Sequence, residues 1–255
     1  MLKNPIFDHL EELGLDGILS ALKEQESAPK TYYDLSFIDR LSHLIDREKA
    51  IRQIHALEKR VRKAQFRHDA CLEDINYRAK RNLDKSAILK LSECNWATKG
   101  ENILITGPTG VGKSYLACAL SHRSCELGFT AQYARATSFF ADLSRRKSEG
   151  KYPLYLAQLA KVHVLVLDDF GLLSLNDEER SGLLEILEDR YKRRSTIITS
   201  QLTYDKWYSA IGNPTFADAI MDRLVHNAHV IALDGQTMRK VGKDEPVPES
   251  KTSKK

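Results

Sequence analysis

Residues 102–114 read Asn-Ile-Leu-Ile-Thr-Gly-Pro-Thr-Gly-Val-Gly-Lys-Ser, a short apolar run that passes into a glycine-rich loop. The apolar, β-branched residues 102–106 suit a buried strand. Residues 107–114 match the pattern G-x-x-x-x-G-K-[ST], and residues 115–120 continue as a helix. A strand, a glycine-rich loop and a helix in this order predict a phosphate-binding loop.

The residue types in this loop suit a nucleoside triphosphate. The glycines let the backbone curl so that several amide N–H groups point at the β-phosphate, and the N-terminus of the following helix adds partial positive charge. Lys113 is expected to neutralise β- and γ-phosphate oxygens, with a catalytic as well as a binding role, and Ser114 to ligate Mg²⁺. The predicted nucleotide-binding residues are Gly107, Pro108, Thr109, Gly110, Val111, Gly112, Lys113, Ser114 and Tyr115. The loop therefore predicts a nucleoside triphosphatase.

A second apolar run ends in two acids. Residues 164–169 read Val-Leu-Val-Leu-Asp-Asp, and a nucleotide hydrolase needs one acid for the metal and another for water. Because neighbouring strand residues point in opposite directions, Asp168 is expected to face the Mg²⁺ bound at Ser114. Asp169 is then expected to orient the attacking water in front of the γ-phosphate.

Two later segments supply further catalytic candidates. Thr199 and Ser200 end another apolar run and are expected to hydrogen-bond the attacking water or the γ-phosphate, although polar residues also cap strand ends. Phosphoryl transfer also needs positive charge on the transition state, which an arginine from a neighbouring subunit often supplies. Arg223 is the first candidate for this role, and Arg239 could reach the nucleotide of its own subunit. An ordinary surface arginine is the alternative for both.

Strand and helix patterns alternate after Cys71. The five strand candidates are residues 102–106, 130–136, 162–168, 195–200 and 229–233. Such alternation predicts an α/β fold with a five-stranded parallel sheet and helices on both faces. The ligand is expected at the carboxyl ends of the strands, where the glycine-rich loop lies.

The preceding residues predict a small all-helical domain. A helix or helix pair is expected from residue 4 to about residue 25, interrupted near Gly14 and Gly17, and a second helical stretch begins near Ser36. Residues 47–67 hold eight Lys or Arg against two Glu, so this stretch either presents a solvated face or contacts a phosphate backbone. The candidate DNA contacts in it are Arg60, Arg62 and Lys63. The predicted organisation is a helical domain over 1–68, for partner or oligomer contacts, an ATPase domain over 69–241 and a disordered tail over 242–255.

Composition limits the class of protein. The net charge of +4 is modest for 255 residues, so nucleic-acid binding has to come from local clusters of charge. The sequence shows no secretory signal and no long apolar span, and its four cysteines lack C-x-x-C spacing, so a reducing cytoplasm and no membrane partner are expected. Cys118, His122 and Cys125 could share a helix face, but core packing is the preferred interpretation over a metal site.

With these residues in place, the chain resembles the IstB-like ATPases, helper proteins of bacterial insertion sequences in the initiator branch of the AAA+ superfamily, together with DnaC and DnaA. The matching stretches are residues 72–75, 100–102, 107–117, 167–171, 195–201 and 222–228. The last two, Ser-Thr-Ile-Ile-Thr-Ser-Gln and Asp-Arg-Leu-Val-His-Asn-Ala, are the most specific. The resemblance covers residues from about 70 to 241, and the N-terminal helices also look like those of the family.

The resemblance implies an ATPase with ATP and Mg²⁺ as cofactors. Such a protein forms a homo-oligomer on duplex DNA when ATP is bound, remodels or marks the target, and recruits or activates a transposase. It also implies an extra helix after the second strand that leans toward DNA, for which the candidate is residues 138–159. Its basic residues, Arg145, Arg146, Lys147 and Lys151, are expected to neutralise phosphates without reading bases; a solvated charged turn is the alternative.

Two departures from the superfamily affect what is carried over. The second acid is usually Glu, and Asp169 is one methylene shorter, so hydrolysis is expected to be slow or to need a partner. No helical lid domain is expected after Arg239, which therefore has to act from the core itself. A replicative helicase loader similar to DnaC, and a regulator that binds ATP without hydrolysing it, are the competing functions.

Overall fold

The computed structural model describes residues 5–238, and contacts divide the chain after Arg60 into two compact units. The helices of the first unit are α1 (Pro5–Glu12), α2 (Asp16–Ser27), α3 (Pro29–Tyr32) and α4 (Phe37–Ala64), the last of which continues past the division. The boundary proposed from the sequence, at residue 68, lies a few residues beyond the end of α4.

Within the first unit, α2 packs closely against α4. A Cβ added to Gly17 would lie 2.6 Å from the backbone nitrogen of Glu48, so only glycine allows this approach. The Glu48 carboxylate accepts hydrogen bonds from the amides of Gly17 (2.8 Å) and Ile18 (3.2 Å), and it thereby caps the first turn of α2. The expected interruption lies at Gly14, which has a φ of 64°, whereas Gly17 is inside α2.

The second unit alternates helices and strands. Its elements are α5 (Lys85–Ser92), α6 (Asn95–Lys99), β1 (Asn102–Thr106), α7 (Lys113–Glu126), β2 (Ala131–Arg135), α8 (Ala136–Ser148), α9 (Tyr152–Lys161), β3 (Val164–Phe170), α10 (Asp177–Arg190), β4 (Ser195–Ser200), a 3₁₀ turn (Tyr204–Lys206), α11 (Trp207–Ile211), α12 (Pro214–Val225) and β5 (Ala228–Ala232). The strands form one sheet in the order β2-β3-β4-β1-β5, and every pairing is parallel.

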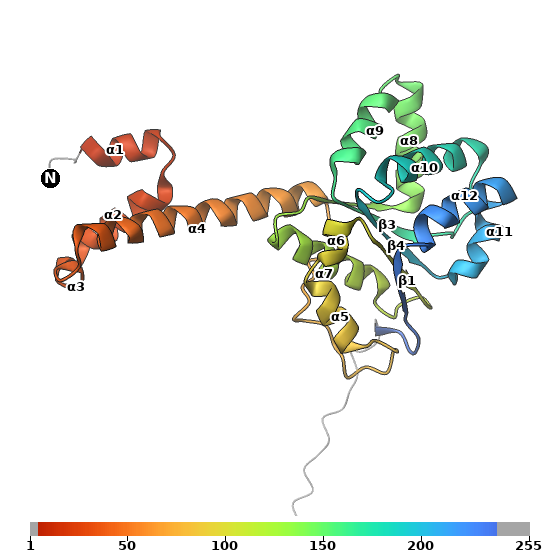
Figure 1. Ribbon diagram of the computed structural model, residues 1–255, viewed down its shortest axis with the longest axis horizontal. Coiled ribbons are helices and arrows are strands. Elements are labelled where there is room, and N and C mark those ends of the chain that lie inside the picture. The colour runs from red at the N-terminus through yellow and green to blue at the C-terminus, as the bar shows by residue number, and fades with distance from the viewer. Residues whose placement is uncertain (1–4, 239–255) are drawn as a thin grey trace, which may run out of the picture. The chain divides into compact units, whose positions relative to one another are not determined.

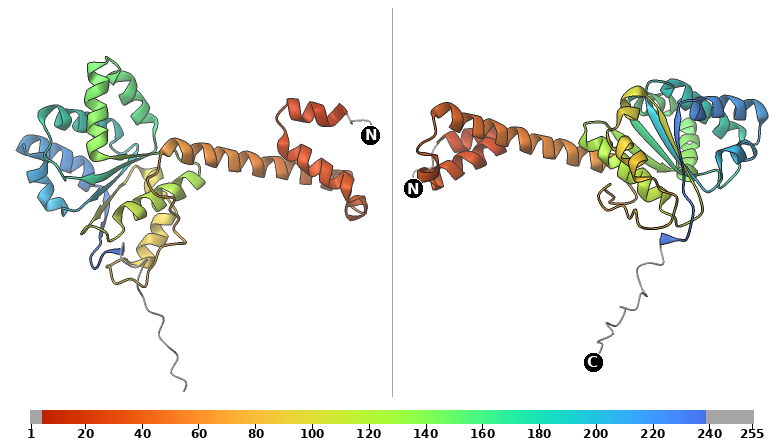
Figure 2. Two further views of the ribbon diagram at one scale, coloured as in Figure 1. Left: turned by 180° about the vertical axis from the view of Figure 1, so that it is seen from behind. Right: turned by 60° about the horizontal axis from the view of Figure 1, so that its bottom comes forward.

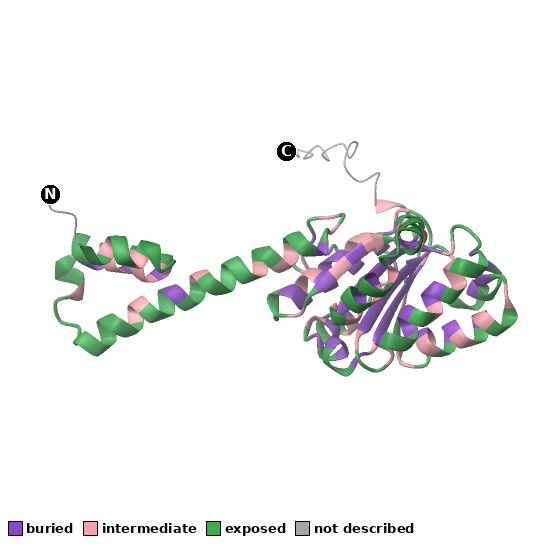
Figure 3. Ribbon diagram, turned by 90° about the horizontal axis from the view of Figure 1, so that it is seen from above, coloured by how far each residue is buried: buried purple, intermediate pink, exposed green. Residues whose placement is uncertain are grey.

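Helices cover both faces of this sheet (Figures 1 and 2). One face is covered by α7, against which α5 packs, and the other by α8 to α12. Every residue of β1 and β4 is buried, whereas the edge strand β5 is largely exposed. Figure 3 shows the central strands almost wholly in the buried colour. A doubly covered parallel sheet has this pattern of near-continuous apolar strands.

The expected five-stranded parallel sheet with helices on both faces is confirmed, and all the strand bounds agree to within two residues. The single helix expected over residues 138–159 is wrong, because the chain forms two helices there. α8 ends at Ser148, and α9 begins at Tyr152 after Gly150, which has a φ of 70°. A left-handed glycine favours helix termination, and Pro153 in the first turn of α9 favours a new start.

Buried Arg190 joins four elements at the amino ends of the central strands. Its guanidinium donates hydrogen bonds to the carbonyls of Leu159 (2.7 Å) and Val162 (2.9 Å), and to Thr196 Oγ1 (3.2 Å). Burial lowers the pKa of Arg190 to about 9, which leaves the side chain charged at neutral pH. One buried cation therefore supplies hydrogen bonds at the ends of four elements, namely α9, β3, α10 and β4.

Each face of the sheet also contains one of the two tryptophans. Trp96 of α6 is 2% exposed and donates its indole N–H to the carbonyl of Leu91. Trp207 of α11 is fully buried against Phe170 and donates to the carbonyl of Leu202. None of the helices within residues 5–238 is long and apolar enough to cross a membrane.

Candidate nucleotide site

The glycine-rich loop between β1 and α7 has the backbone conformation that its sequence predicts. Gly107, Gly110 and Gly112 have φ values of 143°, 88° and 96°, which residues with a side chain rarely adopt. Lys113, the first residue of α7, donates from Nζ to the carbonyls of Gly107 (2.8 Å) and Pro108 (2.7 Å). The lysine ammonium is thereby centred within the curl of the loop.

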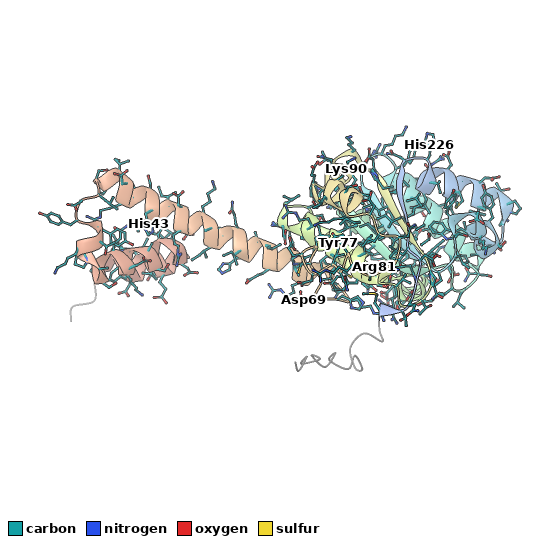
Figure 4. The ribbon with its side chains drawn as sticks, turned by 90° about the horizontal axis from the view of Figure 1, so that it is seen from below. His43, Asp69, Tyr77, Arg81, Lys90 and His226 are labelled. Atoms are coloured by element: carbon teal, nitrogen blue, oxygen red, sulfur yellow. The ribbon has the colours of Figure 1, made fainter. Side chains whose placement is uncertain are left out.

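Two segments from other parts of the second unit support this loop. Arg81 is buried in the segment before α5, where Figure 4 labels it near Tyr77, and its Nη1 donates to the carbonyl of Val111 (3.0 Å). After β5, the amide of Met238 donates to the carbonyl of Gly110 (2.8 Å). A Cβ at Gly112 would lie 2.6 Å from Arg81 Nη1, so the glycine is also needed for this contact.

The first acid of the predicted pair is fully buried at the end of β3. Asp168 Oδ1 accepts hydrogen bonds from Ser114 Oγ (2.7 Å) and from Thr199 Oγ1, and Oδ2 accepts one from the Tyr133 hydroxyl (2.6 Å). Burial and this hydrogen bond to Asp168 raise the pKa of Tyr133, so its hydroxyl stays a donor. The structure thus brings together Ser114 and Asp168, as the sequence predicted, although they are 54 residues apart.

The second acid departs from regular strand geometry. Asp169 has a φ of 60°, and the pairing of β3 with β4 shifts register between Leu167 and Phe170. The Asp169 amide donates to Thr199 Oγ1 (3.0 Å), which links it to the hydroxyl that contacts Asp168. This local distortion turns the Asp169 side chain toward the phosphate loop, where it lines a cavity.

That cavity has a volume of about 600 Å³, enough for a nucleotide. Its lining residues are Arg67, His68, Asp74, Ile75, Asn76, Arg81, Thr109, Gly110, Gly112, Lys113, Ser114, Tyr115, Arg135, Asp169, Gln201 and Met238. Most of the predicted nucleotide-binding residues are in this set. Ser200 is not among the described lining residues; its hydroxyl donates to the carbonyl of Phe170 (2.7 Å) and accepts from the amide of Leu202 (3.1 Å).

The donor atoms fit Mg²⁺ and a triphosphate. Mg²⁺ prefers oxygen ligands and binds through one or two protein groups together with substrate phosphates. Ser114 Oγ and Asp168 Oδ1 are hydroxyl and carboxylate oxygens 2.7 Å apart, beside the amides of the glycine-rich loop. Nothing in this donor set favours a softer metal.

Of the two arginines predicted to act on phosphates, the structure describes only Arg223. Arg223 of α12 forms ion pairs with Glu188 (2.8 Å) and Asp222 (2.5 Å), and its guanidinium stacks 5.2 Å from the Tyr191 ring centroid. Hydrogen bonding to Glu188 raises the pKa of Arg223. Arg223 is not among the residues that line the cavity of its own chain. Arg239 lies outside the described residues.

The predicted DNA contacts on α8 and in the turn that follows it are engaged within the chain. Arg145 pairs with Asp142 (2.9 Å) and Glu149 (3.0 Å), and Lys151 pairs with Glu149 (2.9 Å). Lys147 pairs with Glu178, and the Arg146 guanidinium lies 4.2 Å from the Tyr155 ring centroid. On α4, Arg62 and Lys63 are exposed in the last turn, and Arg60 is half-buried.

Sequence reasoning missed Arg67, Arg81 and Tyr133. Their partners are far away in the chain, and none of the three belongs to a recognised motif. Ile75 and Asn76, in the segment before α5, also line the cavity. Cys118 and Cys125 are buried in α7, and His122 pairs with Glu126 (3.2 Å). In the part of the chain that the structure describes, no group of three or more His, Cys, Asp or Glu could hold a metal ion.

The chain is similar to several known proteins. An insertion sequence ATP-binding protein of Sinorhizobium fredii is 46% identical over 240 residues, which cover 94% of this chain and 98% of that protein. The ATP-binding protein of insertion sequence IS1162 from Pseudomonas fluorescens is 42% identical over 203 residues, which cover 79% of this chain and 87% of that protein. Among solved structures, the DnaC helicase loader has the same fold, with a TM-score of 0.55, 23% identity, and coverage of 65% of this chain and 97% of that chain.

The family model described as IstB-like ATP binding protein matches residues 8–246, which is nearly the whole chain. The phosphate loop, the acid-ended strand and the five-stranded parallel sheet all lie within this range. The protein therefore belongs to the IstB-like ATP-binding protein family.

Proposed function

We propose that this protein hydrolyses ATP and serves as the ATP-dependent DNA-binding helper of a bacterial insertion-sequence transposase. The observation that supports it most is the hydrogen bond of 2.7 Å between Ser114 and Asp168, which joins the phosphate loop to an acid-ended strand. Relatives named as insertion sequence ATP-binding proteins cover nearly all of the chain, which favours the transposition role.

Each part of hydrolysis is assigned to a residue of the site. Lys113 and the loop amides would bind the β- and γ-phosphates. Ser114 and Asp168 would hold Mg²⁺, which when bound would neutralise developing charge on the phosphates. Asp169 accepts a proton from the attacking water, and Thr199 holds the Asp169 amide in place. Asp169 is shorter than glutamate, so we expect turnover to be slow without a partner.

Binding of ATP is proposed to drive assembly of the protein on duplex DNA. Arg223 is displayed outside the cavity of its own chain and suits a neighbouring nucleotide. Arg62 and Lys63 are exposed on α4 and suit phosphate contacts. Arg145 and Lys147 of α8, and Lys151 after it, already pair with acids of the same chain, so their contribution to DNA binding requires exchange of those partners. The assembled form then recruits or activates the transposase.

A helicase loader is the competing function. The similarity to the DnaC helicase loader is at 23% identity and shows the fold alone. A regulator that binds ATP without hydrolysing it would keep the Ser114 contact to Asp168, but it would give no phosphate release. Single-turnover hydrolysis, measured with and without duplex DNA, separates that regulator from an ATPase.

The central experiment compares Lys113→Ala with the matched control Lys161→Ala, an exposed lysine at the end of α9. Loss of Lys113 should weaken ATP binding at least about 100-fold, since charge-assisted hydrogen bonds of this kind contribute ~3 kcal/mol. Calorimetry measures binding, and sedimentation with duplex DNA measures assembly. Normal ATP-dependent assembly of Lys113→Ala would overturn the proposal.

A further inference from the structure

Arg67 supplies a cation to both acids of the nucleotide site. This residue follows the end of α4 by three positions and belongs to the second unit. Its Nη1 lies 3.6 Å from Asp168 Oδ2 and 3.8 Å from Asp169 Oδ2. A single guanidinium nitrogen thus forms ion pairs with two adjacent carboxylates.

The two oxygens of Asp168 have different surroundings. Oδ1 faces the phosphate loop, where Ser114 donates to it. Oδ2 instead accepts a hydrogen bond from the Tyr133 hydroxyl and lies 3.6 Å from Arg67 Nη1. Ser114 and Asp168 Oδ1 would hold the metal ion, whereas Arg67 contacts Oδ2 of the same carboxylate.

This ion pair is more than a surface contact. The Asp168 side chain is 0% exposed, Asp169 is 26% exposed and Arg67 is 31% exposed. Partly buried charges interact more strongly than exposed ones, because water and salt screen them less. Its two partners are the acids proposed to bind the metal and to activate water, so the orientation of both acids depends on this arginine.

We propose that Arg67 is a positioning residue of the nucleotide site, which sets how much Mg²⁺ the site requires and holds Asp169 beside Asp168. This inference rests on the proposed ATPase function. The positive charge of Arg67 opposes a second cation at the same carboxylates, and its contact with Asp169 fixes the acid that activates water. Arg67 consequently lowers the affinity of the site for Mg²⁺ and keeps the two acids in a fixed arrangement.

The test is a Mg²⁺ titration of fluorescent ADP binding, which needs no turnover. Arg67→Gln removes the charge and should lower the Mg²⁺ concentration for half-saturation roughly tenfold, because a nearby like charge is lost. Arg67→Lys keeps the charge and should behave like the unaltered protein. Arg193→Gln, which replaces an exposed arginine in the turn after α10, is the matched control and should also leave the titration unchanged.

Turnover provides the second readout. In Arg67→Gln, kcat for ATP should fall several-fold, because Asp169 is no longer held, while the Mg²⁺ requirement falls as well. A merely structural role would weaken both metal binding and turnover, and it would lower the melting temperature. Arg67→Lys should restore most of kcat.

The outcomes separate this inference from the proposed function. An unchanged Mg²⁺ requirement in Arg67→Gln, or a requirement in Arg67→Lys as low as in Arg67→Gln, would overturn the role of Arg67. If the unaltered protein binds neither Mg·ADP nor Mg·ATP, the proposed ATPase function fails instead.

Discussion

Asp168 uses both carboxylate oxygens, although no part of its side chain reaches solvent. A buried carboxylate is costly unless hydrogen bonds and opposite charge compensate it. Here hydroxyls of Ser114, Thr199 and Tyr133 donate to it, and Arg67 supplies the charge. These contacts therefore hold the acid in place beside the phosphate loop.

The substitution Asp169→Asn tests whether this single side chain activates the attacking water. The amide keeps the size of the side chain but cannot accept the proton from water, so hydrolysis should fall at least about 100-fold. ATP binding should change little, because Lys113 and Ser114 are intact. Phosphate release under single-turnover conditions measures the first effect, and calorimetry the second.

The control for Asp169→Asn is Asp177→Asn, an exposed acid at the start of α10. This variant should hydrolyse ATP at the normal rate. Unchanged phosphate release by Asp169→Asn would remove that carboxylate from catalysis and leave the non-hydrolysing regulator as the better function.

The residues that could be predicted from the sequence belong to motifs that are local in the chain. Lys113, Ser114 and the two acids follow recognisable strand and loop patterns, and the structure places them at one site. Tyr133 and Arg81 could not be found in this way, because their contacts to Asp168 and Val111 span 35 and 30 residues. Such contacts depend on how the strands and the segment before α5 are placed in three dimensions.

Arg190 is the clearest test at the scale of secondary-structure elements. Arg190→Met fills similar space but leaves the carbonyls of Leu159 and Val162 without their buried donor. We expect a loss of ~3 kcal/mol or more in the free energy of unfolding, because unsatisfied buried polar groups are costly. Urea denaturation followed by circular dichroism measures it.

Arg193→Met serves as the control, since Arg193 is exposed in the same turn. Its effect should stay within about 0.5 kcal/mol, as for most surface substitutions. Equal stabilities of the two variants would contradict the role given to Arg190.

Local sequence patterns predict the ends of helices and strands less well than their presence. The apolar run predicted β3 only as far as Asp168, whereas the strand continues to Phe170. The extension depends on the Thr199 hydroxyl, which accepts from the Asp169 amide across the sheet. The break between α8 and α9 did have a local signal in Gly150 and Pro153. The resemblance to a family with one extra helix at this place led to the prediction of a single helix instead.

At the scale of the assembled molecule, Arg223 gives the sharpest prediction. The rate of ATP hydrolysis by Arg223→Ala alone should fall about 1,000-fold, because no arginine supplied in trans then completes the site. Mixing it with Lys113→Ala should restore activity, since an intact Arg223 on one subunit can then reach an intact phosphate loop on the other. Hydrolysis measured across mixing ratios should pass through a maximum.

Two outcomes would count against action in trans. Mixtures that stay as inactive as either variant alone would place Arg223 in another role. Full activity of Arg223→Ala by itself would mean that Arg223 has only the structural contacts with Tyr191 and Glu188.

The placement of the two tryptophans gives the second unit an intrinsic optical reporter. Trp96 and Trp207 are buried on opposite sides of the sheet, and the chain has no other tryptophan. A red shift in emission therefore records loss of packing around the nucleotide domain, and the helices before Arg60 are silent in that signal. Comparing emission with far-ultraviolet ellipticity during heating would reveal whether the two units melt together or separately.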